Sequence, residues 1–392
     1  MNLAALVIPG LDQIAGAERQ VISLAKGLRR RGWRTSVVAL SGAGGQAAAD
    51  LRSAGVEFLS LEMRKGLADP RGWIRFGRWI KRERPQVVHS HLPHAAWLAR
   101  WSRLAQLSHA LPGLASPSHI FIDTLHSSST GTLSRRIGYR CSDWLADRVT
   151  AVSQSVADAH LEARMVGRNK LTVLSNGIDV GEFHPDALTR DAVRRELGLK
   201  EKFLWLAAGR LEAVKDYPTL LHAFAHVPEP ARLLIAGGGS QKSELCQLSK
   251  RLGLDGRVRF LGFQPDVKPW MRAADAFVLS SRWEGLPLGL LEAGACALPS
   301  IATDVPGSRE VIVRGRTGRL TPSGEPCALA RAMNEMMLSS PKERRAMGNL
   351  ARLHVTERFS LEAMLDRWEK LYRNLLAHSY QSRREIHDPI TA

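Results

Sequence analysis

The sequence of 392 residues contains only four cysteines, few aromatic residues and no long run of apolar side chains. The cysteines, Cys141, Cys246, Cys296 and Cys327, show no paired spacing, which argues against a disulfide scaffold and favours free thiols in the cytoplasm. No stretch approaches the roughly 18 consecutive apolar residues of a membrane-spanning helix. Because the chain start lacks a basic stretch and a cleavage site, residues 4–8 predict a first strand and no signal peptide.

Acidic residues are also in the minority. The chain has 38 Asp and Glu against 55 Lys and Arg, a net charge of +17, and residues 1–180 carry 24 of the basic and 13 of the acidic residues. A basic surface attracts anionic partners, here nucleic acid, an anionic membrane face or phosphate-bearing substrates. The sequence contains no recognised nucleic-acid-binding module, so no nucleic-acid partner is expected.

Short apolar runs alternate with segments of helical periodicity along the chain. The runs cover residues 4–8, 36–40, 87–89, 120–124, 148–152 and 171–174, then 203–208, 232–236, 257–261, 276–279 and 299–302. This alternation predicts the α/β class, with parallel sheets covered by helices on both faces. A turn-rich segment interrupts it, which predicts two doubly wound, Rossmann-like domains at residues 1–180 and 190–358. A helix at residues 360–380 is expected to pack back on the first domain.

Ligands of open α/β sheets bind beyond the carboxyl ends of the strands, and five groups of residues fall there. In the first group, Arg210 and Lys215 follow the run at residues 203–208. Two cations at this place suit a diphosphate. The alternative is a solvated pair of charges.

The second group is the segment 284–292, Glu-Gly-Leu-Pro-Leu-Gly-Leu-Leu-Glu. Pro287 favours a first helical turn, so the amides around residues 285–289 are expected to form an anion site at a helix N-terminus. Glu284 is expected at the mouth of this site, and Glu292 about two turns into a buried helix. Alternatively, Glu284 compensates the helix dipole and Glu292 forms a structural ion pair.

Two glycine-containing turns form the third and fourth groups. Gly237, Gly238 and Gly239 predict a tight turn from strand to helix, and Lys242 replaces the third glycine of a dinucleotide fingerprint. Small residues around Gly16 open the first helix and allow close approach to a phosphate, although a plain turn is an equal alternative.

Histidines form the fifth group. His126 follows the run at 120–124, and His89, His91 and His94 cluster at the end of another run. The spacing His-x-His-x-x-His suggests zinc, but no nearby cysteine or acid completes a ligand shell, so no metal site is predicted. The histidines are expected to line the ligand site as hydrogen-bonding groups.

Taken together, these segments resemble the retaining glycosyltransferases of family 4, which have the GT-B fold of two domains facing each other across a cleft. The resemblance covers nearly the whole chain. Its most specific motifs are Gly209-Arg210-Leu211, Lys215-Asp216-Tyr217-Pro218, Gly237-Gly238-Gly239, Phe260-Leu261-Gly262, Ser281-Arg282-Trp283-Glu284-Gly285 and Leu291-Glu292-Ala293. Similar motifs in the first half are Val88-His89-Ser90-His91, Thr124-Leu125-His126-Ser127 and Ser175-Asn176-Gly177-Ile178-Asp179.

The resemblance implies a role for individual residues. Arg210 and Lys215 would hold the diphosphate of a UDP- or GDP-sugar, which is a substrate, so no separate cofactor is expected. Leu288 and Gly289 would bind the diphosphate through their amides, and Gly16 would approach the phosphates. Glu292 would bind the ribose, and Phe263 would contact the base through its backbone. Glu284, Gly285 and Leu286 would bind the donor sugar, which His126 would reach from the first domain.

The chain departs from the family pattern at two positions. Ala15 stands where a first glycine is frequent, which puts the approach of this loop to the phosphates in doubt. Ser280 stands where proline is usual, which is expected to matter little.

The implied chemistry is a sugar transfer that retains anomeric configuration. No Asp-x-Asp metal motif occurs in the sequence, so Arg210, Lys215 and a helix N-terminus would stabilise the leaving diphosphate without a metal. No side chain is an obvious covalent nucleophile. We therefore expect same-face attack through an oxocarbenium-like state, with the leaving phosphate accepting the proton of the acceptor.

Residues 71–84 bear on where the enzyme works. An apolar series, Trp73, Phe76 and Ile80, runs at helical spacing beside a basic series, Arg71, Arg75, Arg78 and Arg82. The next helix also combines tryptophan and arginine, at Trp97, Arg100, Trp101 and Arg103. Such a helix can lie on an anionic membrane, although its apolar face can also cover the sheet.

We therefore expect a cytoplasmic enzyme, peripheral at the inner face of a bacterial cytoplasmic membrane. Its acceptor would be a glycan or a lipid-linked glycan in polysaccharide or lipopolysaccharide biosynthesis. The competing hypotheses are a nucleotide-sugar epimerase on the same fold, a basic nucleic-acid-binding protein and an inactive sugar-binding relative.

Overall fold

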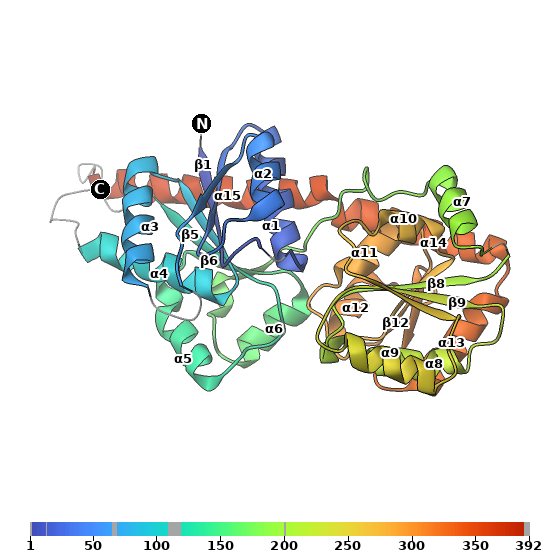
Figure 1. Ribbon diagram of the computed structural model, residues 1–392. Helices are drawn as coiled ribbons and strands as arrows, with labels where there is room; N and C mark the ends of the chain where they lie inside the picture. Colours follow the sequence, from blue (N-terminus) through green and yellow to red (C-terminus); the bar gives the residue numbers. More distant parts are fainter. Residues whose placement is uncertain (1, 13, 65–68, 109–118, 200, 388–392) are drawn as a thin grey trace. The chain divides into compact units, whose positions relative to one another are not determined.

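The computed structural model describes residues 2–12, 14–64, 69–108, 119–199 and 201–387. The chain divides into two compact units, one formed by residues 1–176 and 361–392 and the other by residues 177–360. Each unit contains one parallel sheet with helices on both faces (Figure 1). The predicted α/β class with two doubly wound sheets is therefore confirmed.

The first unit has a seven-stranded sheet in the order β3-β2-β1-β4-β5-β6-β7. Its strands are β1 Leu3–Ile8, β2 Arg34–Ala39, β3 Glu57–Ser60, β4 Val87–His91, β5 Ile120–Leu125, β6 Arg148–Ala151 and β7 Leu171–Val173. The apolar runs predicted six of these strands. Strand β3 was not predicted because it has four residues, of which only Phe58 is buried, so it forms no apolar run.

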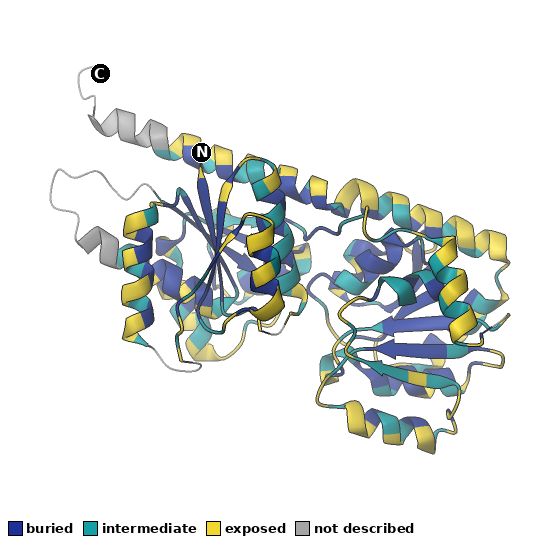
Figure 2. Ribbon diagram, turned by 45° about the horizontal axis from the view of Figure 1, so that its top comes forward, coloured by how far each residue is buried: buried dark blue, intermediate teal, exposed yellow. Residues whose placement is uncertain are grey.

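Helices cover both faces of this sheet because successive side chains of a strand point to opposite sides. They are α1 Gly16–Arg30, α2 Gly45–Ser53, α3 Pro70–Glu83, α4 Pro93–Ser108, α5 Leu133–Ser142, α6 Gln154–Glu162 and α15 Leu361–His387, with short 3-10 helices η1 Asp143–Leu145 and η2 Arg168–Lys170. Leu6 and Ile8 enter one apolar core, whereas Ala5 and Val7 enter the other. Figure 2 shows the resulting pattern of buried strands and helices with one exposed face.

Helix α15 packs against α1 although more than 300 residues separate them in the sequence. Leu365 and Tyr372 lie in the same apolar core as β1. A Cβ atom at Gly27 would lie 2.5 Å from Leu365 Cδ1, so a larger residue at this position would require the Leu365 side chain to move. Arg31 adds ion pairs of 2.7 Å to Asp366 and 2.9 Å to Glu369.

Helix α3 uses its apolar series to cover the sheet, which is the alternative that the sequence left open. Phe76 and Ile80 are buried, and Trp73 packs against the same core. These side chains cannot enter a membrane while the helix stays on the sheet. The interpretation of Arg100 as part of a basic surface was wrong. Its side chain is fully buried and pairs with Asp123 at 2.5 Å. The prediction failed because helical spacing alone does not show which face of a helix points inward.

The second unit has a six-stranded sheet in the order β10-β9-β8-β11-β12-β13. Its strands are β8 Leu204–Ala208, β9 Arg232–Ala236, β10 Val258–Gly262, β11 Ala276–Leu279, β12 Ser300–Thr303 and β13 Gly318–Thr321. Its helices are α7 Ala187–Glu196, η3 Ala213–Lys215, α8 Tyr217–Ala225, α9 Lys242–Arg251, α10 Lys268–Ala273, α11 Leu288–Ala295, α12 Pro306–Val311, α13 Pro326–Leu338 and α14 Pro341–Phe359. The sequence missed only the edge strand β13, which contains one large apolar residue, Leu320.

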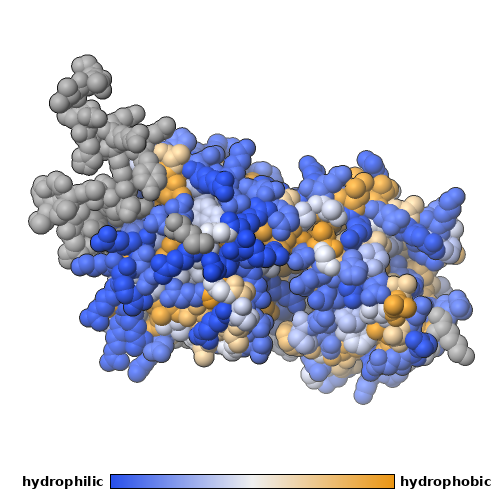
Figure 3. Space-filling view, turned by 90° about the horizontal axis from the view of Figure 1, so that it is seen from above, coloured by the Kyte–Doolittle hydropathy of each residue, from blue (hydrophilic) through white to orange (hydrophobic). Residues whose placement is uncertain are grey.

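The surface of the described residues is mostly hydrophilic. Figure 3 shows blue side chains over most of one face of the molecule, with smaller orange patches between them. Within the described part of the chain, no helix combines the length and the apolar character required to cross a membrane.

Candidate active site

The chain order reverses once in the second sheet, between the neighbouring strands β8 and β11. In open parallel sheets, such a reversal leaves a crevice at the carboxyl ends of the two strands, where ligands bind. Arg210 and Lys215 follow β8, and Glu284 follows β11. The structure therefore brings Glu284, 69 residues after Lys215, to the same sheet edge as Arg210 and Lys215.

Lys215 and Glu284 form an ion pair at this point. Nζ of Lys215 lies 2.5 Å from Oε1 of Glu284, and the side chains are only 19% and 10% exposed. The hydroxyl of Ser281 donates to the same oxygen at 2.6 Å. Oε1 thus has two donors, whereas Oε2 has no partner among the described residues and remains available to a ligand hydroxyl.

Serine residues at the end of β11 hold the two loops together. The Ser280 hydroxyl donates to the backbone carbonyl of Lys215 at 2.8 Å, and the amide of Arg282 donates to the carbonyl of Val214 at 2.8 Å. Proline at position 280 could not make the first bond, so this departure from the family pattern adds a structural link. Neither serine was predicted to have a role, and the only signal in the sequence was the place of Ser281 in the motif before Glu284.

Arg210 differs from Lys215 in its surroundings. Its side chain is exposed, and within the described ranges it makes no hydrogen bond or ion pair. A guanidinium carries five donors in a planar fork that matches phosphate oxygens. Arg210 can therefore bind an anion without first leaving another partner.

Glycines bring the loops after β8 and β9 together. A Cβ atom at Gly237 would lie 1.9 Å from the carbonyl oxygen of Gly209, so no other residue fits there. The amide of Leu211 donates to the carbonyl of Gly238 at 2.9 Å. Phe263, after β10, is exposed and lies next to Gly238. The aromatic ring is thus at the same sheet edge, beside the glycine turn.

The N-terminus of α11 supplies a second positive element. The amides of Leu288 and Gly289 belong to its first turn, where the helix offers no acceptor. Gly285 and Leu286 are buried in the preceding loop. Glu292 is 5% exposed and follows Leu288 by four residues, so it lies on the same side of the helix. An anion bound at the amides would therefore have Glu292 about one turn away.

The first unit places Gly16 and His126 at the carboxyl edge of its own sheet. Gly16 is exposed and begins α1 after β1, and the Glu18 carboxylate accepts a hydrogen bond from the Ala15 amide at 3.0 Å. His126 directly follows β5. Each sheet therefore carries candidate ligand-binding residues at its carboxyl edge.

The histidines were expected to line the ligand site, but not all of them do. His89 is fully buried, and its Nδ1 lies 2.7 Å from the Tyr372 hydroxyl and its Nε2 lies 2.6 Å from Oγ1 of Thr124. His94 is exposed. No group of three or more His, Cys, Asp or Glu side chains placed to hold a metal occurs among the described residues.

Burial controls the charge of the other two histidines. It lowers the pKa of His126 to about 4 and the pKa of His91 well below its usual range. Nδ1 of His91 lies 3.0 Å from Nε2 of His126. Both rings are therefore neutral at physiological pH, and one of them donates to the other.

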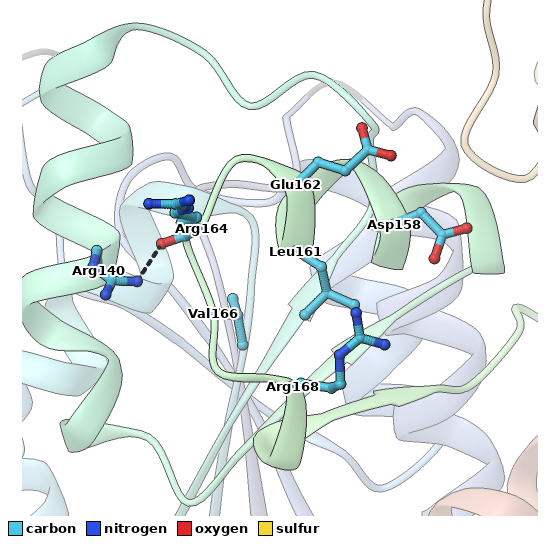
Figure 4. Close-up of a pocket in the computed structure, with 7 residues that line it drawn as sticks. All are labelled: Arg140, Asp158, Leu161, Glu162, Arg164, Val166 and Arg168. Carbon is cyan, nitrogen blue, oxygen red and sulfur yellow. Dashed lines mark hydrogen bonds between the residues drawn. The ribbon is translucent and has the colours of Figure 1, made fainter.

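A hollow of about 350 Å³ lies elsewhere in the first unit. Its lining residues are Arg140, Asp158, Leu161, Glu162, Arg164, Val166 and Arg168. In Figure 4 the Arg140 guanidinium points at the carbonyl of Arg164, to which it donates at 3.0 Å. Helices α5 and α6 end here and β6 and β7 begin here, so the hollow is at the opposite sheet edge from His126.

Comparison with known proteins agrees with this architecture. Residues 14–182 match Glycosyltransferase Family 4, and residues 189–354 match Glycosyl transferases group 1. N-acetyl-alpha-D-glucosaminyl L-malate synthase of Bacillus anthracis is 31% identical over 310 residues, which are 76% of this chain and 76% of that protein. Lipopolysaccharide core biosynthesis glycosyltransferase LpsE of Rhizobium meliloti (strain 1021) is 26% identical over 361 residues, 91% of this chain and 95% of LpsE.

Solved structures show the same two-unit fold. The crystal structure of Anabaena HepE in complex with UDP and glucose superposes with a TM-score of 0.80 at 21% identity, over 95% of this chain and 99% of that one. The chain therefore belongs to the group 1 glycosyltransferases, with the two Rossmann-like units of the GT-B fold.

Proposed function

We propose that this glycosyltransferase moves a sugar from a nucleotide-diphosphate donor, with retention of configuration, to a glycan or lipid-linked acceptor in bacterial polysaccharide or lipopolysaccharide biosynthesis. The observation that carries the proposal is the convergence of Arg210, Lys215 and Glu284 at the point where the second sheet reverses its order. Among the relatives, HepE binds UDP and glucose, and LpsE acts in lipopolysaccharide core biosynthesis.

The leaving diphosphate gains negative charge as the bond to the sugar breaks. In the proposed mechanism Arg210, Lys215 and the amides of Leu288 and Gly289 stabilise that charge. This set supplies two full positive charges and a helix N-terminus, so we propose that transfer needs no metal. Residues of the loop after β10, including Phe263, would contact the base, and Glu292 the ribose.

Sugar transfer itself would proceed on one face of the donor. The bond to the leaving phosphate breaks, the acceptor hydroxyl attacks the same face of the oxocarbenium-like sugar, and a phosphate oxygen accepts the hydroxyl proton. Oε2 of Glu284 is available to orient the sugar, while Lys215 and Ser281 hold Oε1. His126 and Gly16 would contribute from the first unit.

The acceptor side of the proposal includes contact with an anionic membrane. Because Phe76 and Ile80 of α3 are buried against the sheet, we place this contact on α5 and η1. Leu133, Ile137 and Trp144 are 67%, 54% and 60% exposed. Leu133 and Ile137 are four residues apart and therefore lie on one side of α5, and Trp144 follows in η1. We call these three residues the α5 stripe.

Charge around the α5 stripe fits an anionic bilayer. Helix α5 contains three arginines and no acidic residue. Trp97 of α4 packs beside it, since a Cβ atom at Gly138 would lie 2.6 Å from Trp97 Cζ2. Exposed apolar and aromatic side chains with basic neighbours suit the membrane interface. The protein would then be peripheral at the cytoplasmic face of the membrane.

A donor panel tests the proposed activity. The protein should gain thermal stability with a nucleoside-diphosphate sugar, and NMR of the product should show the anomeric configuration of the donor. Chelation of divalent cations should leave turnover largely intact, whereas a strict requirement for Mg²⁺ or Mn²⁺ would contradict the proposed role of the cations. Incubation without an acceptor separates transfer from epimerisation, since only an epimerase would then convert the donor into another nucleotide sugar.

A further inference from the structure

The ring of His126 has one hydrogen bond to a described residue, the contact of its Nε2 with Nδ1 of His91. Both rings are neutral, so each carries one hydrogen, and one of the two facing nitrogens must be the donor. Either His91 Nδ1–H donates to His126, or His126 Nε2–H donates to His91. The choice decides which atom of His126 carries its hydrogen.

The surroundings of Nε2, the second nitrogen of His91, decide between these two arrangements. Nε2 of His91 is buried and has no partner in the described part of the structure. If His91 accepted from His126, its own hydrogen would sit on Nε2 as a buried N–H without an acceptor. That arrangement would bury an N–H group that has lost its hydrogen bond to water, and we take this cost to decide against it. The hydrogen of His91 therefore sits on Nδ1 and is donated to His126.

His89 cannot supply a partner for that nitrogen. Its ring lies against His91, with centroids 4.0 Å apart. The Thr150 hydroxyl donates to the carbonyl of Asp123 at 3.2 Å, so it accepts from Thr124 at 2.8 Å. Thr124 then accepts from Nε2–H of His89.

The same chain of bonds determines the other nitrogen of His89. Its Nδ1 carries no hydrogen and accepts from the Tyr372 hydroxyl at 2.7 Å. Both nitrogens of His89 are thus used. The ring contacts His91 at an interplanar angle of 40° and offers it no hydrogen bond.

The consequence falls on His126. Since Nε2 accepts, the hydrogen of this neutral ring is on Nδ1. That atom has no partner among the described residues, and it is not among the enclosed atoms that lack one. His126 is partly buried, and it presents this N–H group at the carboxyl edge of the first sheet without adding a positive charge.

We propose that His91 is a positioning residue, which holds His126 in the Nδ1–H tautomer so that it donates a hydrogen bond to an oxygen atom of the bound donor sugar. The inference rests on the proposed function in assigning this ligand. It does not rest on it in assigning the tautomer, which belongs to the protein alone.

Nitrogen NMR of histidine-labelled protein tests the tautomer without any substrate. In the wild type, His126 should show a protonated Nδ1 and an unprotonated Nε2. The variant His91→Phe keeps a ring of similar size but removes the donor, so the Nε2–H form of His126 should appear. A wild-type His126 protonated at Nε2, or a tautomer that does not change in His91→Phe, would overturn the proposal.

Two amide variants test whether the donor atom matters. The amide nitrogen of His91→Asn can occupy the place of Nδ1, whereas that of His91→Gln reaches the place of Nε2. Turnover as kcat/KM should fall about tenfold or more in His91→Phe and His91→Gln, the loss of about one hydrogen bond. His91→Asn should recover most of it. Equal losses in the Asn and Gln variants would contradict positioning through Nδ1, and this pair carries the test if His91→Phe does not fold.

The two readouts separate this inference from the proposed function. If the tautomer shifts in His91→Phe while turnover stays unchanged in it and in His126→Ala, positioning is supported and the proposed contact of His126 with the sugar fails. If His126→Ala lowers turnover but the wild-type ring carries its hydrogen on Nε2, the contact is supported and positioning by His91 fails.

Discussion

Lys215 and Glu284, 69 residues apart, form a nearly buried ion pair in which Nζ and Oε1 are 2.5 Å apart. The pair joins the loops after the two strands where the second sheet reverses its order. A ligand phosphate at this place would compete with Glu284 for the lysine, while Arg210 is exposed and forms no ion pair among the described residues. The two cations of the proposed diphosphate site are therefore not equivalent.

Alanine at each cation should expose this difference. Arg210→Ala and Lys215→Ala should both lower turnover by two or more orders of magnitude, because each removes a group that stabilises the leaving diphosphate, worth about 3 kcal/mol. Only Lys215→Ala should also lower the melting temperature, since it leaves the Glu284 carboxylate buried without its cation. Steady-state kinetics and thermal unfolding measure the two effects.

A matched control is available in Arg251, an exposed arginine at the end of α9 and at the opposite edge of the sheet. Arg251→Ala should change neither turnover nor melting temperature. Near-normal turnover in Arg210→Ala would refute the proposed diphosphate site. A double variant, Lys215→Met with Glu284→Gln, should regain stability but not activity.

The two acids should separate nucleotide binding from transfer. Glu292→Gln should weaken binding of the nucleoside diphosphate, because a neutral amide is a poorer acceptor for ribose hydroxyls. Glu284→Gln should lower turnover more than nucleotide affinity. Isothermal calorimetry with UDP and with GDP gives the affinities, and unchanged nucleotide affinity in Glu292→Gln would show that the ribose role is wrong.

Tyr372→Phe tests the bond that ties α15 to the first sheet. The variant removes the donor to Nδ1 of His89 and should cost about 1–2 kcal/mol of unfolding free energy. Tyr139→Phe is the matched control, since Tyr139 is equally buried and its hydroxyl makes no hydrogen bond to a described residue. Equal unfolding free energies of the two variants in urea would contradict a contribution from the Tyr372–His89 bond.

Acid should destabilise the first unit before carboxylates titrate. Burial lowers the pKa values of His89, His91 and His126, the last from 6.5 to about 4. Below pH 6.5 the unfolded chain therefore binds protons that the folded chain does not, so stability is complete above this pH and is lost as the pH falls. The loss approaches about 1.4 kcal/mol per pH unit for each histidine.

Unfolding free energies between pH 7.5 and 5 check this slope. His94→Ala, which replaces the exposed histidine of the same segment, should leave the slope unchanged. His91→Phe should reduce it, because one of the contributing groups is gone. A stability independent of pH in this range would show that the three rings are not neutral in the folded protein.

Membrane contact can be tested by co-sedimentation with liposomes. The wild type should bind anionic vesicles at low salt and bind less at high salt. Serine at Ile137 and Trp144 should weaken binding, whereas serine at Leu188, an exposed leucine of the second unit, should not. Glutamate at Arg75, Arg78 and Arg82 should weaken it through charge. A wild type that ignores anionic vesicles at low salt would make a soluble acceptor the better hypothesis.

Much of the fold could be predicted because its strands are apolar runs, and a parallel sheet buried on both faces requires such runs. Strands β3 and β13 were not predicted because edge strands with few buried side chains contain no apolar run. Helix faces were harder to predict. The spacing of Phe76 and Ile80 fitted a membrane surface as well as a core, and the spacing of Arg100 gave no sign that it is buried against Asp123.

The class of fold, the order of its elements and the chemistry of the residues at the strand ends follow from local sequence, because periodicity and turn residues act over a few neighbouring positions. The pairing of Lys215 with Glu284, the bond of Ser281 to the same carboxylate and the contact of His91 with His126 appear only in the folded chain. These pairs come from different strands, and their contacts depend on which strands become neighbours in the sheet. Local sequence carries no information on that choice, which follows from the burial of the whole chain.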